Sequence, residues 1–166
     1  PTLRQIEHFE TNHPVFRINL LDASKNENYI DKILTWAAEH IGQSPIAIAT
    51  SDDVAGVEAS QAELGRSGAA QLADQLLGEV AKRLYDLGAR RFVVAGGETS
   101  GQVVNSLGIR QVEVSTFDEL GGGYCHQNQP APLSLILKAG ALGKPEFFDT
   151  ALARMRTANE THGDNQ

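Results

Sequence analysis

Cysteine, basic residues and long apolar runs are scarce in this sequence, and each scarcity excludes a class of protein. The 166 residues contain one cysteine, Cys125, which excludes an intrachain disulfide and favours a reducing, cytoplasmic location. No apolar run approaches membrane-spanning length, and the first residues show no signal-peptide pattern. Lysine and arginine number 14 against 21 acidic residues and form no basic stripe. We therefore expect neither a nucleic-acid nor a membrane partner, whereas a nucleotide, which backbone donors bind locally, remains compatible.

Two common nucleotide-binding motifs are also missing. The pattern G-x-x-x-x-G-K-[ST] does not occur, so a P-loop mechanism is not supported. A full G-x-G-x-x-G fingerprint is absent too, which weakens an assignment as an NAD-type dinucleotide domain. Cys125 and His126 are adjacent, as in some nucleophilic or metal-binding pairs, but neighbours on a loop rarely act so without further partners.

Methionine is scarce as well: Met155 is the only one, and the sequence begins with Pro1. We expect the sequence to be a piece of a longer polypeptide. Its length suits one domain of ordinary size with a sizeable core. We expect that domain over residues 1–157 and a frayed polar tail over 158–166.

Helices and strands alternate along the predicted chain. Apolar residues at helical spacing predict helices over 2–10, 26–40, 68–88 and 145–157, with a further short one after Gly97. Apolar segments predict strands over 15–20, 46–50, 92–95, 111–114 and 133–137. Residues 54–67 lack clear periodicity and predict a loop or a poorly defined helix start, and residues 117–132 predict an irregular hairpin or crossover. This order predicts an α/β fold, a three-layer α/β/α arrangement around a mostly parallel, Rossmann-like sheet.

The chain is organised around the stretch from Arg91 to Gln102. Phe92 to Ala95 is apolar without alternation, as in a strand covered on both faces. Gly96 and Gly97 then allow a sharp turn, and Thr99 with Gln102 fits a capping box that starts a helix. Exposed N–H groups at the start of a helix favour an anion, most often a phosphate. A Gly-Gly turn also serves simply to fit a helix against a sheet, so the turn alone does not decide between the two roles.

A second glycine-containing segment, residues 138–143, follows the last predicted strand. If the two strands are neighbours in a parallel sheet, both segments lie at the same edge and form a crevice for a nucleotide. Glu98 is then placed to accept from ribose hydroxyls or to orient magnesium-bound water, or else only to favour the helix N-terminus. Lys138 is placed to neutralise phosphate charge.

These two segments resemble one protein family. The sequences AGGETSG at residues 95–101, LGI at 107–109 and LILKAGALG at 135–143 resemble the C-terminal nucleotide-binding domain of the four-carbon acid sugar kinases. The resemblance reaches upstream to PTLRQI at residues 1–6 and so spans nearly the whole chain. The expected nucleotide-binding residues are Gly96, Gly97, Glu98, Thr99, Ser100, Gly101, Lys138, Gly140 and Gly143.

The resemblance implies ATP- and Mg²⁺-dependent phosphorylation of a four-carbon sugar acid, a tetronate or 3-oxo-tetronate, at its terminal hydroxyl. In the family the sugar acid is held mainly by a separate N-terminal domain, which this sequence lacks, and no residue here is identified as the catalytic base. The family's Gly-Ser-Cys-Ser loop has no counterpart. The last loop departs from the family's Lys-Ser-Gly-Asn-Phe-Gly pattern at Ala139, Ala141 and Leu142, which removes a hydroxyl and an amide. We expect weak nucleotide binding and no turnover by this chain alone.

Other interpretations remain open. A non-catalytic nucleotide- or metabolite-binding module predicts affinity without phosphoryl transfer, and an NAD-type domain predicts preference for NAD. Asp52 and Asp53, at the end of a predicted strand, fit either a turn cap or a water-mediated magnesium site, and the cap is favoured. A strand absent ahead of Pro1 would leave a sheet edge open, so a homodimer is also compatible.

Overall fold

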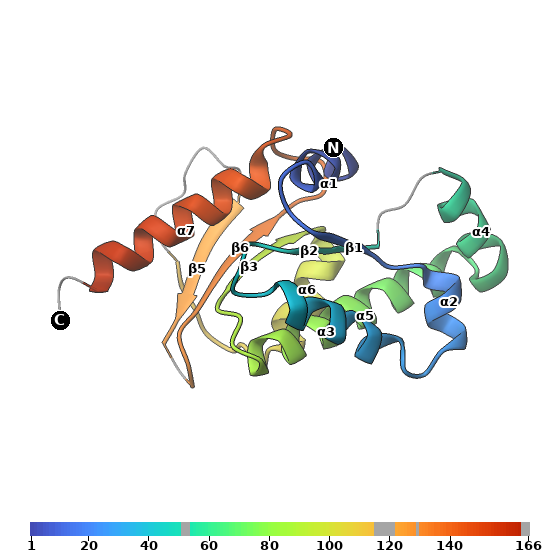
Figure 1. The fold of residues 1–166 in the computed structure, drawn as a ribbon, viewed down its shortest axis with the longest axis horizontal. Coiled ribbons are helices and arrows are strands. Elements are labelled where there is room, and N and C mark those ends of the chain that lie inside the picture. The colour runs from blue at the N-terminus through green and yellow to red at the C-terminus, as the bar shows by residue number, and fades with distance from the viewer. Residues whose placement is uncertain (51–53, 115–121, 129, 164–166) are drawn as a thin grey trace.

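The computed structural model describes residues 1–50, 54–114, 122–128 and 130–163, and Figure 1 shows the arrangement of its elements. In chain order these are α1 (Thr2–Glu10), β1 (Val15–Arg17), α2 (Leu20–Lys25), α3 (Tyr29–His40), β2 (Ala47–Ala49), α4 (Val54–Leu64), α5 (Arg66–Asp86), β3 (Arg91–Ala95), α6 (Gly97–Ser106), β4 (Glu113–Val114), β5 (Gly122–Gln127), β6 (Leu133–Lys138) and α7 (Phe147–Gly163). None of the helices in the described part of the chain has both the length and the apolar character needed to cross a membrane.

A four-stranded sheet in the order β3–β6–β5–β4 carries the two predicted glycine segments. β3 and β6 are parallel, and their last residues, Ala95 and Lys138, are register partners. β5 is antiparallel to β6, and β4 is antiparallel to β5. The prediction of an α/β fold is confirmed, but the expected mostly parallel character is wrong for this sheet. A short connection between β5 and β6 permits only an antiparallel pair.

Helices cover both faces of the four-stranded sheet (Figure 1). α7 packs on one face, where Phe147 and Met155 form a buried cluster with Ile136 of β6. On the other face, Ala81 of α5 and Val103 of α6 pack against Val94 of β3. β6 therefore has almost no exposed residue, which explains its apolar sequence without alternation.

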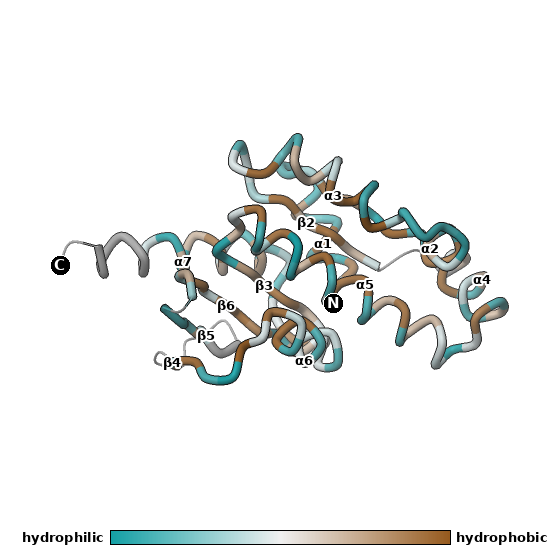
Figure 2. Tube along the Cα trace, turned by 90° about the horizontal axis from the view of Figure 1, so that it is seen from below, coloured by the Kyte–Doolittle hydropathy of each residue, from teal (hydrophilic) through white to brown (hydrophobic). Residues whose placement is uncertain are grey.

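A second, two-stranded parallel sheet joins β1 to β2. It packs with α3 and α5 in the largest core cluster, whose fully or nearly buried members are Ile18, Tyr29, Ile33, Leu34, Ala37, Leu76, Val80 and Leu84. Figure 2 shows the hydropathy along the chain, with alternating hydrophobic and hydrophilic bands on α5 as expected for a helix covered on one side. Phe92 of β3 also contacts this cluster, so the two sheets share buried neighbours.

Strongly periodic segments form the elements predicted for them. The helix over Thr2–Glu10 has the predicted bounds, and β3, β4 and β6 lie where apolar segments predicted them. β4 lies at a sheet edge, as the charged Glu113 within it predicted. Gly88 and Gly108 follow the ends of α5 and α6 with φ of +108° and +67°, a conformation that glycine adopts without a steric penalty.

Three elements differ from what the sequence indicated. α4 forms over 54–64, where the sequence left a loop or a poorly defined helix start open, because alanine, glutamate and leucine favour helix even when apolar residues are not gathered on one side. α2 takes Leu20 out of the expected strand, since Asn19 caps the helix by accepting from the Asp22 amide at 3.0 Å. β5 includes Gly122 and Gly123, in the segment expected to be irregular. α7 continues to Gly163, into the segment expected to be a frayed tail.

Candidate functional site

A glycine turn joins β3 to α6 at the carboxyl end of the parallel pair. Gly96 is the N-cap residue of α6 and has a φ of +115°, which an L side chain rarely adopts. Its N–H donates to the Lys138 carbonyl at 2.9 Å, and its own carbonyl accepts from the Ser100 N–H at 2.9 Å. The turn is therefore fixed both to the neighbouring strand and to the helix that it starts.

The first turn of α6 provides donors for an anion. The N–H groups at the first positions of a helix have no partner within it, and the helix dipole adds partial positive charge there. Gly97 and Glu98 are exposed. An added Cβ on Gly97 would meet no atom within 4 Å, so the space above its Cα is open. A phosphate at this end of the sheet could therefore come close enough to accept hydrogen bonds from backbone N–H groups.

The predicted capping box is wrong. Gly96, not a side chain, caps α6. Instead, the Thr99 hydroxyl donates to Asp74 Oδ1 of α5 at 2.6 Å. Gln102 directs its amide to the Ser106 hydroxyl, one helical turn further along, at 3.5 Å. Thr99 thus attaches the first turn of α6 to α5 and does not cap the amide groups of α6.

The second glycine segment is folded around Lys138. The side chain is buried, with 1% of the residue exposed, and Nζ donates to the carbonyls of Ala139 at 2.8 Å and Gly140 at 3.3 Å. Burial lowers the pKa of its ammonium group. Lys138 therefore contacts the backbone of its own loop, a position that the sequence did not indicate.

Two side chains of α1 donate hydrogen bonds to the same loop. The Thr2 hydroxyl donates to the Gly140 carbonyl at 2.9 Å. Gln5, of which 1% is exposed, donates through Nε2 to the carbonyls of Leu142 and Lys144, both at 3.0 Å. Gly143 has a φ of +91°, and an added Cβ there would lie 2.8 Å from Gln5 Nε2. The loop is shaped by helix α1 even though the two are at opposite ends of the sequence.

The structure brings the predicted nucleotide-binding residues to one region, because β3 and β6 are neighbours. These residues differ in exposure and in hydrogen bonding. Glu98 and Gly101 are exposed, whereas Ser100 is buried and its hydroxyl has no hydrogen-bond partner among the described residues. Within those residues, no group of three or more His, Cys, Asp or Glu side chains is placed to hold a metal ion. Asp52 and Asp53 lie outside the described residues.

The sequence did not indicate three residues that contact the two glycine segments, namely Asp74 at the turn and Thr2 and Gln5 at the loop after β6. Asp74 lies four positions before Gly78 on α5, and this spacing puts both on the side that faces α6. The spacing was the available signal for Asp74. Nothing in the sequence indicated that α1 would contact the loop after β6, because such contacts depend on the tertiary arrangement.

Cys125 and His126 do not form a reactive pair. They are consecutive residues of β5, so their side chains point to opposite faces of the sheet. Cys125 is buried and packs with Leu133 and Leu135, and burial raises the pKa of its thiol. His126 instead contacts the Ser134 hydroxyl at 3.2 Å and Asn128 Oδ1 at 2.8 Å.

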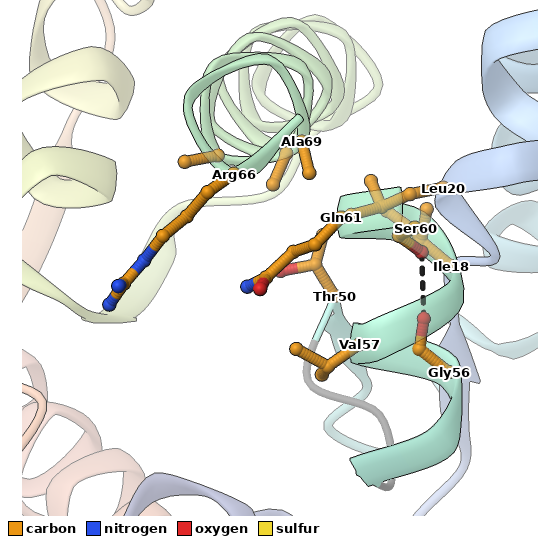
Figure 3. A pocket seen from close by; sticks show the side chains of 11 residues that line it. Ile18, Leu20, Thr50, Gly56, Val57, Ser60, Gln61, Arg66 and Ala69 are labelled. Carbon is orange, nitrogen blue, oxygen red and sulfur yellow. Dashed lines mark hydrogen bonds between the residues drawn. The ribbon is translucent and has the colours of Figure 1, made fainter. Parts of the chain in front are cut away.

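A separate cavity of about 230 Å³ lies between α4 and α5, beside the ends of β1 and β2 (Figure 3). Among the described residues that line it, Arg66 is the one that carries a charge. The Ser60 hydroxyl on its wall donates to the Gly56 carbonyl at 2.8 Å. Ala69, Ala70 and Ala73 form the α5 side. None of the predicted nucleotide-binding residues lines this cavity.

Comparison with known proteins shows similarity along most of the chain. The family model described as "Nucleotide-binding C-terminal domain" matches residues 1–148. A "3-oxo-tetronate kinase" of Pseudomonas savastanoi is 39% identical over 151 residues, and one of Cupriavidus necator is 40% identical over 146 residues. These matches cover 90% and 88% of this chain. A crystal structure of a Haemophilus influenzae protein superposes with a TM-score of 0.82 at 25% identity, over 92% of this chain.

The chain spans about a third of the proteins that it matches. The shares covered are 34% and 33% of the two relatives and 37% of the Haemophilus influenzae protein. The similarity therefore concerns one domain of longer proteins.

Proposed function

The chain belongs to the nucleotide-binding C-terminal domain family of the four-carbon acid sugar kinases, and from this premise we propose that it binds Mg-ATP at the glycine turn between β3 and α6. In this proposal it is the nucleotide-binding part of a kinase that phosphorylates a four-carbon sugar acid, a tetronate or 3-oxo-tetronate, at its terminal hydroxyl. The four-stranded sheet with helices on both faces serves as its three-layer, Rossmann-like scaffold. We further propose a cytoplasmic location and an assembly as a homodimer.

One observation carries the proposal: the glycine turn and the loop after β6 lie at the same end of adjacent parallel strands. The Gly96 N–H to Lys138 carbonyl bond connects them directly. The space beside the Gly97 Cα is open, and the first N–H groups of a helix have no partner within it. Phosphates bind well where helix N-terminal donors and a glycine backbone coincide.

The residues of the turn suit distinct parts of the nucleotide. The backbone from Gly97 to Thr99 would hold phosphate oxygens, and the buried Ser100 hydroxyl is a further donor without a partner among the described residues. Mg²⁺ keeps several waters and is held by one or two carboxylates together with phosphates, so the exposed Glu98 at the helix start fits a water-mediated contact. The bound ion would offset phosphate charge during transfer. Lys138 would act through the loop carbonyls that it holds, rather than by direct contact.

The acceptor and the catalytic base are not assigned to this chain. We propose that another domain of the longer kinase supplies most of the contacts with the sugar acid. The isolated chain is then expected to bind nucleotide weakly and to give no turnover. A non-catalytic module would bind nucleotide yet give no phosphoryl transfer in the longer protein either, and an NAD-type domain would prefer NAD to ATP.

Substitution of Gly97 tests the proposed site. Gly97→Val adds bulk where the chain itself has room, so the fold should persist while the phosphate space is filled. We expect Mg-ATP affinity to fall at least ~10-fold, about 1.4 kcal/mol, in calorimetric titration. Gly68→Val on α5 is the matched control, since its added Cβ would meet only Leu64 Cβ at 3.8 Å. Equal Mg-ATP affinity of the wild type and Gly97→Val would show that the glycine turn is not part of the nucleotide-binding site.

A further inference from the structure

Asp74 is the charged residue of α5 that reaches the glycine turn. Its Oδ1 accepts from the Thr99 hydroxyl at 2.6 Å, a short hydrogen bond to a carboxylate between two different helices. Thr99 and Asp74 are both half-buried, so the bond is partly protected from water. Hydrogen bonds to ionised groups are shorter and stronger than neutral ones. The start of α6 is therefore tied to α5 by a specific contact.

The same hydroxyl lies against the turn itself. A Cβ built on Gly96 would lie 3.2 Å from Thr99 Oγ1, a tight contact, and the φ of +115° at Gly96 also disfavours an L side chain, so the hydroxyl lies close beside a turn that needs glycine. Asp74 thus fixes Thr99, and Thr99 packs against Gly96. The Gly96 N–H donates to the Lys138 carbonyl, so this series of contacts continues to the loop after β6.

Close packing of α5 against α6 fixes the position of Asp74. Gly78, one helical turn further along α5, allows α6 to approach so closely that a Cβ there would lie 2.6 Å from Ser106 Oγ and 2.9 Å from Gln102 Cγ. The Asp74 backbone is therefore held at a set height relative to the first turn of α6. A loose helix pair would let the carboxylate and the hydroxyl separate.

The charge of Asp74 opposes the ligand, which argues that its role is geometric. A carboxylate near a helix N-terminus stabilises the empty site, but it repels phosphate. A residue selected for binding phosphate by charge would be cationic here. The useful property of Asp74 is its acceptor oxygen, which the amide of asparagine also provides.

We propose that Asp74 is a positioning residue that orients the glycine turn for the nucleotide phosphates through the Thr99 hydroxyl. This inference rests on the proposed function, and it adds a residue of α5 to the residues that determine phosphate affinity. It makes a distinctive claim: removing the acceptor weakens binding, whereas removing only the charge does not.

Three variants test the claim by titration with Mg-ATP and by amide hydrogen exchange of the segment 94–102. Asp74→Ala should weaken Mg-ATP binding ~10-fold and speed exchange at the start of α6. Asp74→Asn should retain or improve the wild-type affinity and retain its exchange rates. Asp86→Ala, an exposed aspartate of the same helix, is the matched control.

Two outcomes would overturn the inference. Asp74→Ala with wild-type affinity and exchange would show that the bond has no role, and Asp74→Asn behaving like Asp74→Ala would show that charge is what matters. If the wild-type chain binds no ATP, the proposed function fails, and the exchange rates alone still decide whether Asp74 orders the turn. Thermal unfolding of each variant separates loss of the fold from loss of the turn.

Discussion

Lys138, in the second glycine segment, has a different structural role from the one that its residue type alone indicates. Lys138 resembles a phosphate-binding lysine in sequence, yet its ammonium group is buried and donates to two carbonyls of its own loop. No carboxylate lies within ion-pair distance of it among the described residues. The charge is therefore stabilised mainly by carbonyl dipoles and costs free energy to bury.

This burial predicts a pH dependence of stability that comes from Lys138. Its folded pKa lies below the ordinary value of 10.5, so in the alkaline range below that value the unfolded state binds more protons. Stability then rises with pH through this window. Lys138→Met removes the titrating group, so the free energy of unfolding of the wild type minus that of the variant should increase with pH in the alkaline range below 10.5. Urea unfolding at several pH values measures it, and a constant difference would contradict the burial of a charged Lys138.

Among the elements, α5 and α6 form the scaffold behind the glycine turn. Their contact depends on Gly78, where a Cβ would lie 2.6 Å from Ser106 Oγ and 3.3 Å from the Gln102 carbonyl. A glycine within a helix is otherwise unfavourable by about 1 kcal/mol relative to alanine. Close packing is the reason for glycine at this position.

Alanine substitutions at two glycines of α5 should therefore have opposite effects. Gly78→Ala forces the helices apart, and we expect a loss of about 1–2 kcal/mol after the gain in helix propensity is subtracted. Gly68→Ala meets only Leu64 Cβ at 3.8 Å and should stabilise the chain by about 0.5–1 kcal/mol. Chemical denaturation of both variants measures the contrast. Stabilisation by Gly78→Ala would show that α5 and α6 are not closely packed.

The predictability of an element depends on how much of its signal is local. α1, α5 and β6 carry long apolar patterns, so the sequence predicted them. α4 has apolar residues all round and β5 begins with two glycines, so neither pattern indicated its element. The start of α6 was predicted within two residues, but its cap was assigned to Thr99, because a sequence does not show that an aspartate of another helix competes for the hydroxyl.

For the whole molecule, the sequence predicted that the two glycine segments lie at the same edge if their strands are neighbours in a parallel sheet, and β3 and β6 are such neighbours. The directions of β5 and β4 did not follow from the alternation of helices and strands, because the sequence left a hairpin or a crossover open over 117–132 and the structure has a hairpin between β5 and β6. The contacts that shape the site come from α1 and α5, far away in sequence. Such contacts follow from the tertiary fold and not from any local pattern.

Nucleotide preference tests the central claim of this account most directly. The intact chain is titrated with Mg-ATP in a calorimeter, alone and in the presence of excess NAD. We predict a measurable though weak ATP affinity that NAD does not reduce, because the turn offers helix N-terminal donors for phosphates and lacks the dinucleotide fingerprint. Absence of ATP binding by the folded chain, or displacement of ATP by NAD, would contradict the assignment of the glycine turn to a kinase nucleotide site.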